Sequence, residues 1–214
     1  MNNKIIFILT AIVLAIGFAV ATAVYNNENS SSVNTTNNIG LVEREGAPIK
    51  GSEDAKVTIV EFFDPACGTC AQFYPLVNKI IEKYPGKVKV MMRYAPLHQG
   101  SDQVVKMLEA AHKQGQFWPA VELLMANQNR WVINHVSQPV SAEMGLGQIN
   151  LDRKKFQMDW QSAEVAAIVE KDIADGKALK VRATPEFFVN GKPMPRFGYE
   201  QLLTLVEEAI KDVY

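Results

Sequence analysis

Cysteine is scarce in this sequence: Cys67 and Cys70 are the only two among 214 residues. This scarcity excludes a framework of several disulfides and a zinc site built from cysteines alone. A chain of this length can bury a sizeable core without such cross-links. Haem attachment through Cys-x-x-Cys-His is excluded as well, because Ala71 follows the second cysteine.

A charge excess is also missing, since 22 Lys and Arg side chains balance 23 Asp and Glu side chains to a net charge of -1. No basic run occurs either, so we expect no nucleic acid partner. The three histidines, His98, His112 and His135, show no paired metal-ligand spacing. We therefore expect no metal and no other cofactor.

Long apolar runs are confined to the N-terminus, where residues 5–24 are almost entirely apolar. This run is typical of an export signal. It is long enough to cross a bilayer, yet Ala21-Thr22-Ala23 has the small-x-small pattern that signal peptidase cuts. Residues 1–25 are thus predicted to be a cleaved signal peptide or a membrane anchor. Either prediction places the remainder in the periplasm or extracytoplasmic envelope, soluble or tethered through residues 5–24.

The region after this run changes abruptly to Asn, Ser and Thr, and residues 26–46 are predicted to form a flexible polar linker. Residues 47–214 then show the periodicities of a folded α/β domain. In chain order we expect a strand at 57–63, a helix opening at 67–70, a strand at 87–94, a helical block at 101–178, a strand at 186–189, an Asn190-Gly191 hairpin turn and a helix from about 199.

The cysteine pair stands at the predicted start of the first helix. Unpaired N–H groups and the positive end of the helix dipole there favour a thiolate at Cys67. Cys70, one turn further in, is expected to be shielded and to act as the resolving thiol. The pattern favours thiol–disulfide exchange over two alternatives, an inert disulfide and half of a metal site.

Three separated motifs resemble the DsbA-type branch of the thioredoxin superfamily. They are Glu61-Phe62-Phe63, Cys67-Gly68-Thr69-Cys70, and Thr184-Pro185 followed by Glu186-Phe187-Phe188-Val189-Asn190-Gly191. The resemblance spans about residues 48–214. It implies a thioredoxin fold with a helical subdomain inserted at about 101–178, in agreement with the helical block.

The resemblance also implies roles for single residues. Pro185 matches the family's cis-proline facing the cysteines, which would leave the backbone of Thr184 free to pair with a substrate chain. Glu61 matches the family's buried acid, which could relay protons to Cys70. An ordinary trans proline and an exposed or lysine-paired glutamate are the alternatives.

The function expected from these observations is disulfide exchange with the cysteines of exported proteins, in the oxidising direction, with a membrane protein as redox partner. Two features also fit an envelope reductase or isomerase-like enzyme kept reduced by a membrane donor. No histidine stands between the cysteines, and Thr184 resembles the reductase and isomerase relatives where the prototype oxidase has valine. A non-catalytic binding or chaperone module of the same fold is a further alternative.

Overall fold

A computed structural model of the chain describes residues 40–214. The predicted export signal and most of the predicted linker lie outside the described residues. Within 40–214, none of the helices is both long and apolar enough to span a membrane.

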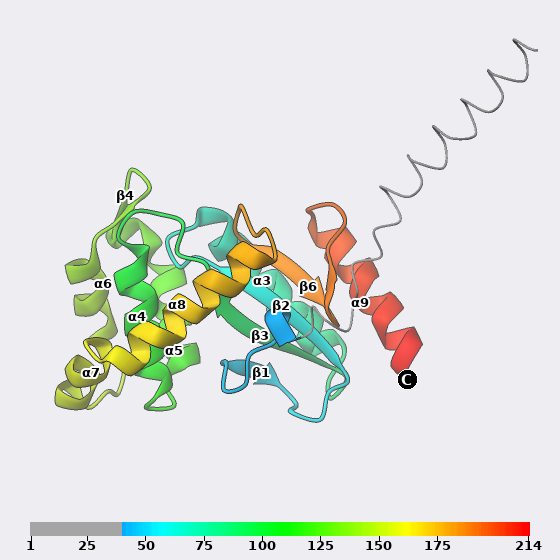
Figure 1. Cartoon of the computed structure of the whole chain (residues 1–214), viewed down its shortest axis with the longest axis horizontal. Helices are drawn as coiled ribbons and strands as arrows, with labels where there is room; N and C mark the ends of the chain where they lie inside the picture. Colours follow the sequence, from blue (N-terminus) through cyan, green and yellow to red (C-terminus); the bar gives the residue numbers. More distant parts are fainter. Residues whose placement is uncertain (1–39) are drawn as a thin grey trace, which may run out of the picture. The chain divides into compact units, whose positions relative to one another are not determined.

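The centre of the described part is a mixed five-stranded sheet with the strand order β1-β3-β2-β6-β7 (Figure 1). Its central strand β2 pairs in parallel with β3 and antiparallel with β6. The outer strands β1 and β7 pair antiparallel with β3 and β6. The strands are β1 (Ile49–Gly51), β2 (Val57–Phe63), β3 (Val88–Tyr94), β6 (Glu186–Val189) and β7 (Lys192–Pro193).

Helices cover both faces of this sheet, so β2 is buried along its whole length. On one face, α3 (Gly68–Lys83) and α9 (Tyr199–Val213) pack on a large core that includes Ile59 and Phe63 of β2. On the other face, Phe62 belongs to a smaller core against which Leu179 and Val181 pack, just after α8 (Ala163–Ala178). Alternate residues of β2 therefore point towards different helices.

The helical block predicted at 101–178 is present as an insertion between β3 and β6 (Figure 1). Its helices are α4 (Ser101–His112), α5 (Phe117–Ala126), α6 (Pro139–Leu146), α7 (Arg153–Trp160) and α8, with a short η1 (Gln128–Arg130). It also holds an unpredicted hairpin of β4 (Val132–Ile133) and β5 (Val136–Ser137). Strands this short carry too few residues to show a period of two.

The folded part begins earlier than the sequence indicated. The linker was predicted to extend to residue 46, whereas Val42 is fully buried and Arg44 is 8% exposed. The guanidinium of Arg93 donates to the carbonyl oxygens of Leu41 and Val42, at 3.0 and 2.8 Å. Asp172 of α8 accepts from both Arg44 and Arg93 at 2.7 Å. These isolated side chains have no periodicity, so no sequence pattern marks the segment as folded.

Candidate active site

Cys67 is the N-cap residue of α3 and has an extended backbone. A tight turn delivers the chain from β2 to this position, in which the N–H of Cys67 donates to the carbonyl of Asp64 at 3.0 Å. The carbonyl of Cys67 in turn accepts from Ala71 at 3.2 Å and so begins the helix. The Cys67 side chain therefore lies at the end of α3 where backbone N–H groups are unpaired.

The surroundings of Cys67 stabilise its thiolate. A hydrogen bond from the Cys70 thiol, one from the Thr184 side chain and the N–H groups of Cys70 and Thr69 together lower the pKa of Cys67 from 9.0 to about 5, against an opposing effect of burial. When the thiol is protonated, it donates to the carbonyl oxygen of Thr184, 3.1 Å from Sγ. Only 7% of Cys67 is exposed, so a reaction partner meets it at a small opening.

Cys70 lies behind Cys67 on the first turn of α3 and is completely buried. Burial raises the pKa of its thiol far above the ordinary value, and the hydrogen bond to Cys67 and the charges of Glu61 and Cys67 raise it further. Cys70 is thus a proton donor to its neighbour at neutral pH, while Cys67 is a thiolate.

Glu61 is 1% exposed and points to the α3 side of the sheet, since it alternates with Val60 and Phe62 on the opposite face. Its Oε2 is a buried oxygen with no hydrogen-bond partner among the described residues. Burial, followed by repulsion from the Cys67 charge, raises the pKa of Glu61 to about 8. The alternative of an exposed or lysine-paired glutamate does not fit this environment.

The peptide bond between Thr184 and Pro185 is cis. Pro185 is buried and immediately precedes β6, whose residues pair with β2. This placement brings Thr184 against Cys67 although the two are far apart in the sequence. The structure therefore assembles Cys67, Cys70, Glu61 and the Thr184-Pro185 segment at one end of the sheet.

Asp64 is a further residue of this region, and sequence reasoning did not single it out. Its fully buried carboxylate accepts from the backbone N–H groups of Ala66, Leu97 and His98 at 2.7 to 2.8 Å. It also contacts His98 Nδ1 at 2.8 Å and the Ser101 hydroxyl at 2.5 Å. Asp64 thereby ties the turn before Cys67 to the β3–α4 loop. An aspartate directly before Pro in a turn is the one sequence signal for it.

The helical insertion also contacts the active-site turn. Gln128 of η1 donates through Nε2 to the carbonyl oxygens of Pro65 and Cys67, at 2.6 and 3.0 Å. Two of the three histidines contact acids instead of a shared centre, His98 with Asp64 and His112 with Glu109. Across residues 40–214, no group of three or more His, Cys, Asp and Glu side chains is placed to hold a metal ion.

Comparison with known proteins places this geometry in a family. The family profile described as Thioredoxin matches residues 43–208. A curated relative, disulfide bond formation protein D of Bacillus subtilis (strain 168), is 27% identical over 176 residues, which cover 78% of each chain. The crystal structure of BdbD from Bacillus subtilis (oxidised) superimposes with a TM-score of 0.68 and 26% identity, over 78% of this chain and 94% of that one.

Other curated relatives are much longer. The Na(+)/H(+) antiporter NhaA of Herminiimonas arsenicoxydans is 32% identical over 169 residues, covering 78% of this chain but 26% of the antiporter. The chain thus spans about a quarter of the length of the first curated relatives it matches.

Because the profile covers more than half of the chain, this protein belongs to the thioredoxin family, in its DsbA-like branch. The fold expected from the sequence, a thioredoxin fold with an inserted helical subdomain, is confirmed.

Proposed function

We propose that this protein oxidises cysteine pairs of exported proteins by exchanging its own Cys67–Cys70 disulfide. The carrying observation is the contrast between the two thiols, since the pKa of Cys67 is lowered to about 5 and that of Cys70 is raised. A stabilised thiolate is a good leaving group and makes the reduced form the favoured one, which is the property of an oxidant.

The reaction proceeds in two exchanges. A substrate thiolate attacks Cys67 Sγ, the Cys67–Cys70 bond breaks, and Cys70 leaves as a thiolate that takes up a proton. The second substrate thiolate then attacks the substrate sulfur of the mixed disulfide and releases Cys67 as a thiolate. Two electrons pass from substrate to protein, and a new substrate disulfide forms.

Glu61 and Thr184 support these steps. Glu61 lies buried on the side of the sheet that α3 covers, and its raised pKa of about 8 suits it to supply the proton that Cys70 takes up. The backbone of Thr184, beside Cys67, is the edge on which an extended substrate segment pairs.

The place of action is extracytoplasmic, and the apolar run at residues 5–24 supports this part of the proposal, as a cleaved signal or as a tether. A membrane redox partner that reoxidises the cysteine pair completes the cycle. The names of the relatives support the direction, since one is a disulfide bond formation protein.

Two measurements test the proposal. Equilibration with glutathione should give a reduction potential between about -270 and about -120 mV, the values of thioredoxin and DsbA, whose cysteine pKa values of about 7 and about 3.5 bracket that of Cys67. The oxidised protein should also convert the thiols of reduced, unfolded ribonuclease A to disulfides, and the Cys67→Ala variant should not. A potential at the thioredoxin end would reverse the direction to reductase, and equal activity of Cys67→Ala would favour a binding module.

A further inference from the structure

A groove of about 450 Å³ lies between α8 and the two loops that flank the active site. Its lining includes the apolar side chains of Leu97 in the β3–α4 loop, Ile173 of α8 and Val181. Leu97 is 54% exposed and Ile173 is 42% exposed, which leaves large apolar side chains facing water. The volume lies within the range of pockets that hold small ligands or a few residues of a peptide. Figure 1 shows α8 running from the helical insertion to the sheet.

The rim of this groove is basic. It carries Lys177, Lys180 and Arg182, all exposed, and none of the three forms an ion pair within residues 40–214. The acid in the groove wall, Asp172, is fully buried and already accepts from two arginines. The groove thus combines apolar lining side chains with three positive charges that lack a counter-charge from the described chain.

Both walls of the groove continue into the active site. Arg182 lies two positions before Thr184, whose carbonyl contacts Cys67. The N–H of Leu97 on the other wall donates to Asp64 at 2.7 Å, in the turn that leads to Cys67. An extended peptide advances about 3.3 Å per residue. A substrate segment paired beside Thr184 would therefore bring its second or third residue from the reacting cysteine to Arg182 and the groove.

We propose that this groove selects substrate cysteines that have an acidic and an apolar residue two or three positions away. The inference rests on the proposed disulfide exchange and adds a substrate preference to it. The apolar side chain covers Leu97 and Ile173, and the carboxylate supplies the counter-charge for Arg182 and Lys180. A lysine at the same position meets three like charges and is disfavoured.

The test compares single-turnover rates of the oxidised protein with three synthetic peptide dithiols. The three peptides differ only at the residue two positions from each cysteine, on the side away from the other cysteine, which is Asp, Lys or Ser. The residue three positions from each cysteine is Leu in all three peptides. Each reaction converts the peptide dithiol to a disulfide and the Cys67–Cys70 disulfide to a dithiol. Samples are quenched with acid at successive times, and the fraction of oxidised peptide is measured. The Asp peptide should react about fivefold faster than the Lys peptide at low salt, the size expected for exposed ion pairs. Most of this ratio should disappear at about 0.5 M salt.

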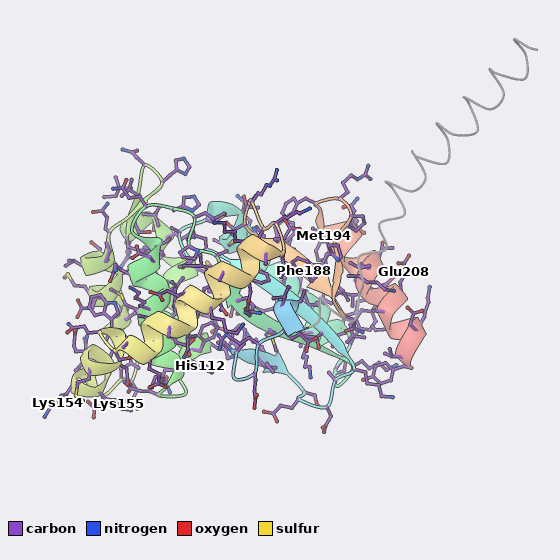
Figure 2. The ribbon with its side chains drawn as sticks, viewed as in Figure 1. His112, Lys154, Lys155, Phe188, Met194 and Glu208 are labelled. Carbon is purple, nitrogen blue, oxygen red and sulfur yellow. The ribbon has the colours of Figure 1, made fainter. Side chains whose placement is uncertain are left out.

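Charge reversal locates the effect. The double variant Lys180→Glu and Arg182→Glu should invert the ratio of the Asp-peptide rate to the Lys-peptide rate. The single variant Lys177→Glu, on the exposed face of α8, should at least halve the ratio and serves if the double variant does not fold. The matched control is Lys154→Glu, because Lys154 is exposed at the α7 end of the molecule, away from Phe188 of β6 (Figure 2).

The outcomes separate the two proposals. If none of the peptides is oxidised, the proposed function fails. If all three are oxidised at equal rates, or if Lys154→Glu changes the ratio as much as the groove variants do, the exchange activity remains and the selective groove is refuted.

Discussion

Replacing Glu61 with glutamine should stabilise the reduced protein by an amount that grows with pH. The folded-state pKa of Glu61 is raised to about 8 from an ordinary value of 4.5. Below pH 4.5 the carboxyl is protonated in the folded and unfolded states, so it costs no stability. As the pH rises from 4.5 towards 8, the unfolded state ionises while the folded state keeps the proton, and the parent protein loses stability.

The size of the effect follows from the pKa difference. pH 7 lies about 2.5 units above the pKa of Glu61 in the unfolded state and below its pKa in the folded state. At 1.36 kcal/mol per unit, ionisation of the unfolded state therefore lowers the unfolding free energy of the parent protein by about 3 kcal/mol at pH 7. Glutamine stays neutral in both states. The difference in unfolding free energy between Glu61→Gln and the parent should therefore grow by about 3 kcal/mol between pH 4 and pH 7.

Urea denaturation under reducing conditions at a series of pH values measures this difference. Glu208→Gln is the control, since Glu208 is exposed on α9 (Figure 2), and its difference from the parent should stay nearly flat. Parallel stability curves for Glu61→Gln and the parent would mean that Glu61 ionises in the folded state. The reasoning from its burial would then be wrong.

Three further predictions concern other buried groups. The alkylation rate of Cys67 by iodoacetamide should level off above an inflection near pH 5, and an inflection near pH 9 would contradict a stabilised thiolate. Arg93→Ala should lower the unfolding free energy by about 3–5 kcal/mol, because Asp172 loses a buried partner, and a loss below about 1 kcal/mol in urea titration would refute this. Asp64→Ala should lower the unfolding free energy by at least about 2 kcal/mol, because the backbone N–H groups of Ala66, Leu97 and His98 lose their acceptor. An unchanged thermal midpoint would contradict this stabilising role of Asp64.

The long elements of the fold could be predicted from the sequence because their composition or periodicity is strong. Six of the seven residues of β2 are β-branched or aromatic and mark the strand, and the apolar spacing of α9 marks the terminal helix. The strands β1, β4, β5 and β7 contain two or three residues each, and only tertiary pairing defines them. The early start of the fold at Leu41 depends on the distant Arg93 and so has no local signal.

In the candidate site, too, residues that are close in the sequence could be predicted, whereas residues that meet only through the fold could not. Cys67 and Cys70 are close in the sequence, so their spacing and the following helix period predicted their arrangement. Thr184 was named through the family resemblance alone, since its contact with Cys67 spans most of the domain. The face occupied by Glu61 could not be predicted, because β2 is buried on both sides and shows no polar alternation. Asp64 acts through hydrogen bonds to two loops, which a linear pattern does not reveal.

The contacts around Asp172 also determine where the protein can be shortened. A version trimmed to begin at residue 47 would keep every strand of the part that the structure describes, yet it would lose Arg44 and the carbonyl oxygens of Leu41 and Val42 that Arg93 binds. Asp172 would retain one arginine instead of two, next to a newly uncovered patch of sheet. Any processing event that preserves the stability of the domain must therefore cut upstream of Leu41.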